Sequence, residues 1–199
     1  MNRKPKGYFG LGHQVVGAQI QSVLESIPQS EQVFDAELTA GLRGVISDGW
    51  YPVHWFLLLL EVIEHRLGPL GLMEAGRHLY RSGQRGQAVA PSSAADVLYA
   101  YDGGYLKTNR GQLIGGFRVT HFGPGLACLE MTAPLPCKLA EGALLEGLST
   151  IGIRALIGQQ RCFRRSDDSC SFSISSSIDD HRWGEQKPSF ALLGGALRS

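Results

Sequence analysis

No long hydrophobic run occurs in this chain of 199 residues. The longest strongly apolar stretch, residues 55–63, already contains Glu61, and it is far shorter than the ~20 residues that a membrane-spanning helix needs. The first twelve residues are basic and then glycine-rich, without the apolar segment of a secretory signal. We therefore expect a cytoplasmic protein.

An excess of charge of one sign is also missing. The chain has 19 Lys and Arg against 18 Asp and Glu, for a net charge of +1. This balance excludes a basic stripe over the whole domain, as nucleic-acid binding would need, and a polybasic membrane anchor. Because 43% of the residues are hydrophobic and 19% are charged, the chain is too apolar to be disordered. We expect one domain over residues 14–180, a flexible arm over 1–13 and a tail over 181–199.

The signatures of several enzyme classes are absent as well. The sequence has no Walker loop, no Gly-x-Gly-x-x-Gly after a strand, no Gly-x-Ser-x-Gly and no His-Glu-x-x-His. Glu61 and His65 are four residues apart on a predicted helix and could share a face, but a solvent-facing ion pair is the ordinary interpretation of such a pair. We therefore expect no enzymatic activity and no catalytic residues.

Hydrophobic periodicity predicts helices in the first half of the chain and strands in the second. The predicted helices cover residues 15–27, 37–46, 52–67, 70–82 and a segment capped by Ser92 or Ser93. The predicted strands cover residues 117–122, 127–132, 154–163 and 170–178, with a helix over 141–151. This order indicates an α+β fold, in which a helical bundle packs on a C-terminal antiparallel sheet with one embedded helix.

Three of the four cysteines could form a metal site. Cys162 and Cys170 flank the loop of a predicted hairpin, and Cys137 precedes the embedded helix. Three thiolates and one more donor can hold a soft divalent ion such as Zn²⁺. Three buried thiols are the alternative interpretation, because the spacing is not that of a Cys-x-x-Cys knuckle.

Haem is not supported by the motifs. Tyr80-Arg81-Ser82, followed by Arg85, approximates the Tyr-x-Ser-x-Arg clamp that holds haem propionates, but the arginine lies one residue too far along the chain. No histidine can be assigned as the proximal ligand. We therefore expect no haem cofactor.

Several short motifs follow one another in a fixed order through residues 14–178. They are Val16-Gly17-Ala18, Gly49-Trp50-Tyr51-Pro52, Pro136-Cys137, Glu141-Gly142, Leu145-Glu146-Gly147-Leu148, Cys162 and Cys170-Ser171-Phe172-Ser173-Ile174. This order resembles the 4-vinyl reductase type of ligand-binding domain. Within it, the chain is most similar to a bacterial paralogue family of unassigned function that is related to haem nitric-oxide-binding domains.

The resemblance implies a fold shared with haem-based nitric oxide sensors, aromatic-responsive transcription activators and TRAPP vesicle-tethering subunits. It also implies a small apolar ligand or a protein partner, and in many members a homodimer. In the activator branch, three cysteines and a glutamate hold zinc. Cys137, Cys162 and Cys170 match those cysteines, whereas Gln159 takes the place of the glutamate. Because a neutral amide is a poor zinc ligand, this departure weakens the case for zinc, whose implied role is structural.

The resemblance places a ligand between the helices and the sheet. The predicted lining is aromatic and consists of Trp50, Trp55, Phe56, Tyr80, Tyr101 and Phe117. The alternative is that these rings only fill the core. We predict a non-catalytic sensory or regulatory domain that binds a small hydrophobic or aromatic effector as a homodimer and signals to an unidentified protein partner. Two alternatives stay open: an adaptor with a filled core, similar to TRAPP subunits, and a tetrapyrrole-related reductase or accessory protein.

Overall fold

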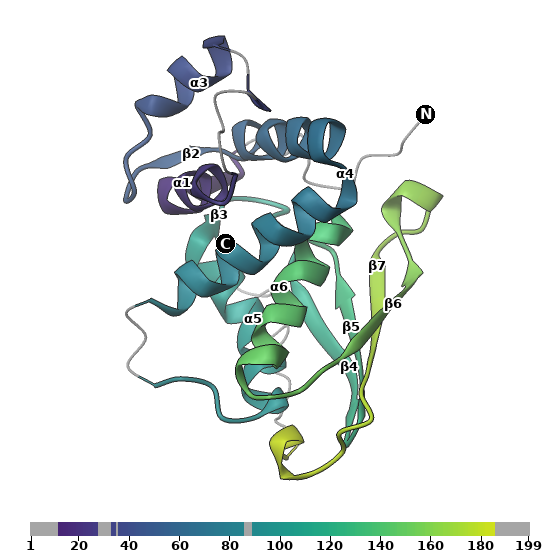
Figure 1. Cartoon of the computed structure of the whole chain (residues 1–199). Coiled ribbons are helices and arrows are strands. Elements are labelled where there is room, and N and C mark those ends of the chain that lie inside the picture. Colours follow the sequence, from purple (N-terminus) through teal and green to yellow (C-terminus); the bar gives the residue numbers. More distant parts are fainter. Residues whose placement is uncertain (1–11, 28–32, 35, 86–88, 186–199) are drawn as a thin grey trace, which may run out of the picture.

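The structure is a computed structural model that describes residues 12–27, 33–34, 36–85 and 89–185. A layer of helices lies over a sheet that carries two further helices (Figure 1). The elements are β1 (Gln14–Val16), α1 (Gly17–Glu25), α3 (Ala36–Arg43), β2 (Trp50–Pro52), α4 (Val53–Gln84), α5 (Ala94–Thr108), β3 (Asn109–Arg110), β4 (Phe117–Gly123), β5 (Leu126–Met131), α6 (Cys137–Thr150), β6 (Leu156–Arg161) and β7 (Cys170–Ser175). Short 3₁₀ turns cover Phe163–Arg165 and His181–Trp183. In the part of the chain described, no helix is long and apolar enough to cross a membrane.

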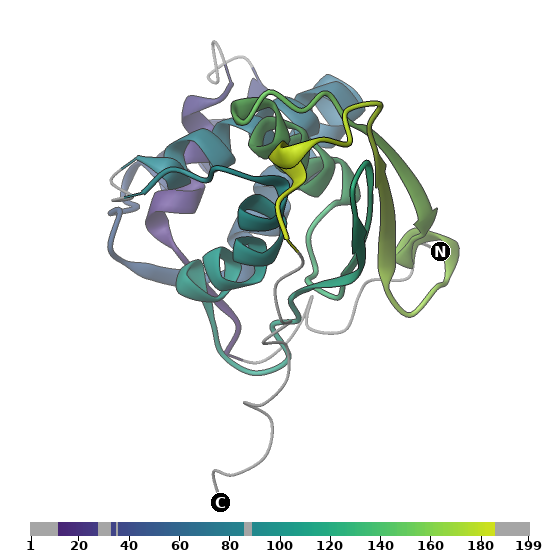
Figure 2. The ribbon, with the colours of Figure 1, turned by 90° about the horizontal axis from the view of Figure 1, so that it is seen from below.

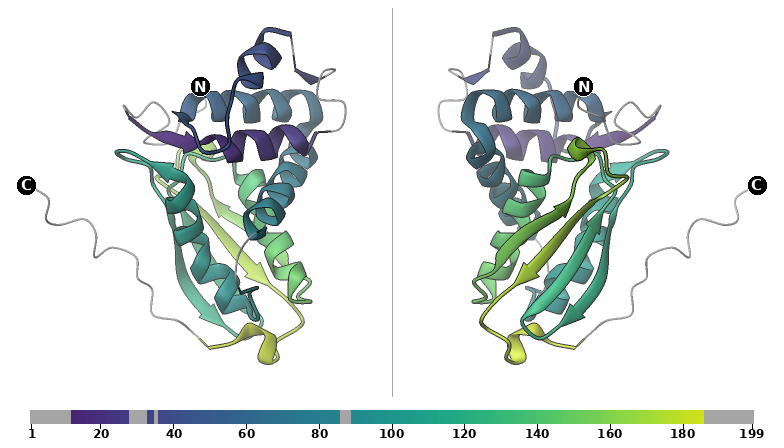
Figure 3. Two further views of the ribbon diagram at one scale, coloured as in Figure 1. Left: turned by 90° about the vertical axis from the view of Figure 1, so that its left-hand side faces the viewer. Right: turned by 90° about the vertical axis from the view of Figure 1, so that its right-hand side faces the viewer.

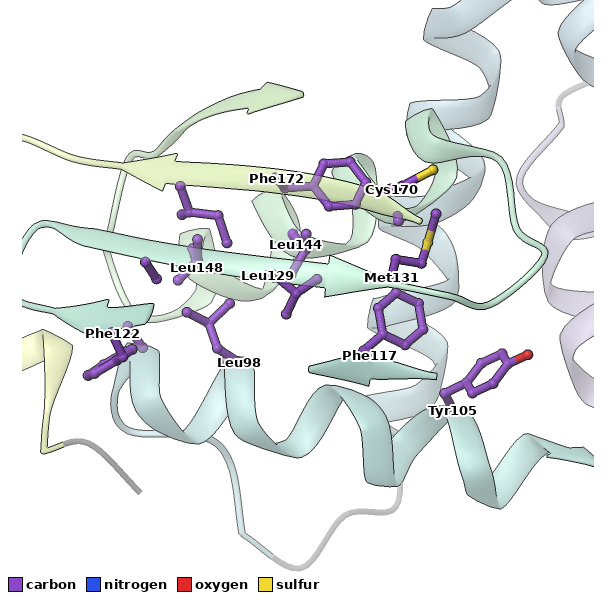
Figure 4. Close-up of a cluster of buried hydrophobic side chains, with 14 of the residues drawn as sticks. Leu98, Tyr105, Phe117, Phe122, Leu129, Met131, Leu144, Leu148, Cys170 and Phe172 are labelled. Carbon is purple, nitrogen blue, oxygen red and sulfur yellow. The ribbon is translucent and has the colours of Figure 1, made fainter. Parts of the chain in front are cut away.

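The main sheet has four antiparallel strands in the order β4-β5-β7-β6. Helices α5 and α6 lie against it (Figure 3). Their apolar side chains, such as Leu98 and Leu144, meet Leu129 and Phe172 of the sheet in one buried cluster (Figure 4). The predicted α+β fold with an antiparallel sheet and one embedded helix is confirmed.

Helix α4 bends at Gly68, where the sequence predicts one helix to end and another to begin. Gly68 has a φ of +68°, a conformation that glycine adopts without a Cβ penalty, and Pro69 follows it. The second half of α4 then crosses α6 at two glycines. A Cβ on Gly76 would lie 2.0 Å from the carbonyl oxygen of Leu139, and a Cβ on Gly142 would lie equally close to that of Met73. The two helix backbones are therefore in direct contact.

A second, small sheet was not predicted. Strands β2, β1 and β3 pair antiparallel, whereas the sequence analysis assigns residue 15 onward to a helix. The chain is extended up to Val16, and α1 begins at Gly17. The amides of Gly17 and Ala18 donate to the carbonyls of Gly49 and Ser47, both at 2.8 Å. These bonds satisfy two of the four free N–H groups at the start of α1, which has no side-chain cap.

The boundaries of the domain also differ from the predicted ones. Trp183, which the sequence analysis assigns to the tail, is 0% exposed. Its ring lies 5.7 Å from that of Phe122, and its indole N–H donates to the carbonyl of Ile178. At the other end, His13 of the predicted arm is 2% exposed and hydrogen-bonded to Asn109. The core therefore includes residues 13 and 183, while the rest of the predicted arm up to residue 11 and of the tail from 186 lies outside the described residues.

Candidate ligand cleft and thiol cluster

A cleft of about 950 Å³ opens between α5, α6 and the second half of α4. Its floor comes from Leu139, Ala140 and Ala143 of α6, which α4 holds in place through the glycine contacts described above. One rim is the extended segment 89–92 before α5. Figure 2 shows this segment crossing the end of the molecule toward the 3₁₀ turn at residues 181–183.

Four tyrosines line the cleft: Tyr80, Tyr99, Tyr101 and Tyr105. The rings of Tyr101 and Tyr105 meet the ring of Phe117 edge to face, at 4.8 and 5.4 Å. Their hydroxyls donate to main-chain carbonyls, that of Tyr101 to Ala140 at 3.4 Å and that of Tyr105 to Ile114 at 2.5 Å. Burial raises the pKa of both tyrosines. Both side chains are therefore neutral donors at physiological pH, and they present mainly apolar surface to the cleft.

The structure brings together half of the predicted ligand-binding residues. Tyr80, Tyr101 and Phe117 line the cleft. Trp50, Trp55 and Phe56 belong to the N-terminal layer instead. Trp50 lies under the guanidinium of Arg110, Trp55 stacks on Tyr51, and Phe56 is buried in the core formed with α1.

Sequence reasoning missed two residues of the lining, Tyr99 and Tyr105. Tyr105 follows Tyr101 by four residues, a spacing that puts both side chains on one face of a helix. That spacing was the available signal for Tyr105. No comparable signal pointed to Tyr99.

The three predicted thiol ligands do meet. The Sγ atom of Cys137 lies 3.0 Å from that of Cys170 and 3.6 Å from that of Cys162, and all three sulfurs lie within 4.8 Å of one another. Cys137 is the first residue of α6, Cys170 the first of β7, and Cys162 follows β6. Cys162 and Cys170 are buried, whereas Cys137 is partly exposed. Figure 4 shows Cys170 at the start of β7, beside Met131 and Phe172.

Hydrogen bonds polarise this thiol cluster. The thiol of Cys137 donates to the sulfur of Cys170, and the main-chain N–H of Phe163 donates to the same sulfur at 3.5 Å. These bonds lower the pKa of Cys170 to about 7, the larger effect being that of Cys137, and the same pairing raises the pKa of Cys137. The pKa values of the two thiols are therefore shifted in opposite directions by one contact. The amide N–H of Gln159 donates to Cys137 Sγ at 2.8 Å.

The sulfur positions are compatible with a tetrahedral zinc ion. With Zn–S bonds of about 2.3 Å, two sulfurs of such a site lie roughly 3.8 Å apart. The observed separations of 3.0 and 3.6 Å require only small side-chain adjustments. Gln159 contacts this cluster through its amide N–H, which donates to Cys137 Sγ, so its amide oxygen would have to turn toward an ion to serve as a fourth donor.

Comparison with solved structures reveals close similarity of fold at low sequence identity. An H-NOX protein from S. oneidensis in the Fe(II)NO state has a TM-score of 0.67 and 14% identity, over 81% of this chain and 99% of that one. Unliganded Fe(II) H-NOX from K. algicida has a TM-score of 0.60 and 11% identity, over 81% and 96%. The chain has the H-NOX fold. No family model and no curated protein matches the sequence.

The H-NOX fold agrees with part of the resemblance seen in the sequence. It is the fold that a relation to haem nitric-oxide-binding domains implies. The 4-vinyl reductase part stays a prediction. The solved structures do not favour an adaptor.

The prediction that excludes haem is contradicted. Solved structures with this fold include haem proteins, among them one from a study of haem distortion in the H-NOX family, with a TM-score of 0.62 and 11% identity over 82% of this chain. The prediction rested on a clamp motif at Tyr80–Arg85. In the structure, Arg81 instead forms ion pairs with Glu74 and Glu146, so the motif says little about the cleft.

The cleft lining meets some requirements of haem. Its size and apolar rings suit a flat macrocycle. Haem iron takes its axial ligands from histidine, cysteine, methionine or tyrosine side chains. Of these residue types, only tyrosine occurs in the described lining of the cleft. Of the tyrosines, Tyr80 lies near Thr150 and Glu146, and burial raises its pKa.

Proposed function

We propose that the chain is a non-catalytic sensory domain whose cleft between α4, α5 and α6 binds a planar, mostly apolar ligand. The observation that carries this proposal is the cleft of about 950 Å³ with its four tyrosine rings and Phe117. The H-NOX fold supports it, because solved structures with that fold are of haem proteins. Haem, or another porphyrin of similar size, is therefore the first ligand to test.

The polar groups of the cleft indicate how such a ligand would be oriented. The hydroxyls of Tyr101 and Tyr105 already donate hydrogen bonds to main-chain carbonyls. The interior of the cleft would therefore recognise a ligand by its shape and by apolar contact. Lys107 and Arg118 lie among the lining residues and are exposed. Lys107 would receive a carboxylate of a porphyrin at the mouth of the cleft, where charged groups stay hydrated, whereas Arg118 would first have to leave its ion pair with Glu130.

Titration with haemin and with metal-free protoporphyrin IX tests the proposal. We expect both pigments to bind, because the cleft is proposed to hold the porphyrin macrocycle, which the two pigments share. Binding should change their visible absorbance and reach one pigment per chain. Replacing the exposed, cleft-lining Ala100 by Trp should weaken both affinities by about tenfold or more, since a ring then occupies the mouth. Ala40→Trp, on the exposed surface of α3 outside the cleft, is the matched control.

Two results would overturn the proposal. One is the failure of both pigments to bind, and the other is equal binding by the Ala100→Trp variant and the control. If haemin binds and protoporphyrin does not, the iron ligand dominates, and Tyr→Phe variants at Tyr80 and Tyr99 then identify it.

We also propose a homodimer that signals to a protein partner. Light scattering should then give twice the chain mass of 21.6 kDa.

Zinc at Cys137, Cys162 and Cys170 is the second part of this proposal. Such an ion would join the N-terminus of α6 to the β6–β7 hairpin, and its role would be structural. We expect one zinc per chain by elemental analysis, and we expect its loss in Cys162→Ser. At a free zinc concentration of 100 times Kd, binding stabilises the fold by about 2.7 kcal/mol, so a chelator should lower Tm. Zinc that persists in the Cys162→Ser variant would refute this part.

A further inference from the structure

The described part of the chain ends beside the opening of the cleft. A Cβ on Gly184 would lie 2.7 Å from the hydroxyl of Ser93, the residue that caps α5 and follows the rim segment 89–92. On the other side, the guanidinium of Arg182 donates to the carbonyl of Gly152, just after α6. Figure 2 shows this end of the described chain beside the start of α5. The next part of the chain therefore begins close to both helices that border the cleft.

The sequence that follows is apolar. Residues 186–199 contain no acidic residue. Their large hydrophobic side chains are those of Phe190, Leu192, Leu193 and Leu197, which gain free energy by leaving water. We propose that the segment Phe190–Leu193 docks in the cleft of its own chain and that a ligand must displace it. The displacement rests on the proposed function of the cleft, whereas the docking does not.

The lengths of the chain segments fit this docking. Phe190 follows the last described residue by five positions, which gives it an extended reach of roughly 17 Å. Along α5, Tyr101 of the lining lies eight residues from Ser93, a distance of about 12 Å. Along α6, Ala143 of the floor lies nine residues before Gly152, a distance of about 14 Å. Phe190 can therefore reach the interior of the cleft from either helix end.

The cleft lining suits a peptide as well as a flat ring. Val89 at the rim is 79% exposed, so a large apolar side chain is uncovered at the entrance. Gly103 and Gly104 of α5 belong to the lining, and a Cβ on either would have nothing within 4 Å. A surface without side chains allows another main chain to approach closely. The side-chain amide of Gln84, also in the lining, can donate to and accept from that main chain, whose polar groups need partners once buried.

The short connection favours docking within one chain over docking in a second copy. A short tether gives an effective concentration in the millimolar range, about a thousandfold above that of a second copy at micromolar concentration. A segment whose free peptide binds with a Kd of about 0.1 mM would then occupy the cleft about ten times as often as not. Its presence would lower the apparent affinity of a competing ligand about tenfold.

Photo-cross-linking of the full chain tests the docking without any pigment. Phe190 is replaced by its photoreactive analogue p-benzoylphenylalanine, the protein is irradiated, and its tryptic peptides are analysed by mass spectrometry. Because trypsin does not cut between Lys187 and Pro188, the segment falls in the peptide 183–198. We expect cross-links within one chain from this peptide to residues 139–143 on the cleft floor, located by fragmentation of the cross-linked peptides.

Two tryptophan variants control the cross-linking. Ala100→Trp, which narrows the opening of the cleft, should reduce the yield about fivefold or more, whereas Ala40→Trp on the exposed surface of α3 should leave it unchanged. Circular dichroism checks the folding of each variant. Cross-links mainly between two chains, cross-links only outside residues 139–143, no cross-link, or equal yields in the two variants would each overturn the docking.

Pigment binding tests the displacement. The double variant Phe190→Ser/Leu193→Ser should bind protoporphyrin IX about tenfold more tightly than the unsubstituted chain. The matched control, Leu126→Ser/Leu156→Ser, removes two exposed leucines outside the lining and should not change the affinity. Equal affinities in all three proteins would refute the displacement. If none of them binds the pigment, the proposed function fails together with the displacement, while the cross-links still decide the docking.

Discussion

At the residue scale, this chain differs from a zinc site of three cysteines and one glutamate at position 159, where it has a glutamine. Its amide donates a hydrogen bond to Cys137 Sγ, whereas a metal site needs a donor atom that faces the ion. Sequence reasoning identified the thiols because the predicted hairpin brings Cys162 near Cys170, whereas residue 159 was identified only through the resemblance to a zinc-binding family branch. It could not identify the sulfur separations, which depend on where α6 begins.

We predict that Gln159→Glu strengthens zinc binding by about tenfold or more, because a carboxylate replaces a neutral amide at the fourth position. Competition with a chromogenic chelator at pH 7 measures the two affinities. Gln160→Glu is the control, since residue 160 is the exposed neighbour on the same strand. Equal affinities in all three proteins would show that residue 159 does not contact the ion.

A second residue-scale prediction concerns Glu130, which accepts hydrogen bonds from Arg118, Arg161 and Ser169. The bond from Arg118 is the largest cause of the lowered pKa of this carboxyl. A carboxyl whose pKa is lower in the folded state stabilises the fold above its unfolded pKa, and it loses that effect as the pH falls below about 4.5. Because the arginines are exposed, the effect is small, at most about 1 kcal/mol.

We therefore expect Glu130→Gln to be slightly less stable than the unsubstituted protein at pH 7, and we expect the difference to be smaller at pH 3, which lies below the unfolded pKa. Urea unfolding at both pH values measures it. A constant difference at the two pH values would mean that the carboxylate charge has no part in the effect.

At the element scale, the crossing of α4 and α6 determines where the cleft lies. Gly68 and Pro69 predicted the bend in α4 correctly, because their backbone preferences are local. The sequence likewise predicted a cap for α5 at Ser92 or Ser93, and it is the Ser93 side chain that accepts the Asp96 N–H. The small β2-β1-β3 sheet was missed because its strands are two or three residues long and depend on pairing between distant segments, which leaves no periodic signal.

We predict that Gly76→Ala destabilises the protein by about 2 kcal/mol or more, because the new Cβ would lie 2.0 Å from the Leu139 carbonyl oxygen and would force the helices apart. Gly83→Ala, in the same helix but with nothing within 4 Å of its Cβ, should be neutral or slightly stabilising. Denaturant unfolding of both variants measures the difference. Equal stabilities would contradict the close crossing.

At the scale of the whole molecule, the N-terminal layer holds the half of the ligand-binding prediction that does not fall at the cleft: Phe56 is in its buried cluster, whereas Trp50 and Trp55 are not. An aromatic residue in the sequence favours a buried position, but it does not indicate which of the two clusters the residue joins. Phe56 belongs to the N-terminal cluster with α1, whereas Phe117 belongs to the cluster between the sheet and its helices. That division depends on the packing of entire layers, which a single sequence does not reveal.

The central claim is that a ligand binds in the cleft between α4, α5 and α6. Hydrogen–deuterium exchange with and without protoporphyrin IX measures it most directly, because it reports protection segment by segment. We predict added protection in α5, in α6 and in residues 69–84 of α4, with no change in α3 or β6. Protection confined to α3 or β6, or none anywhere at saturating pigment, would contradict the proposal that the cleft between these three helices is the binding site.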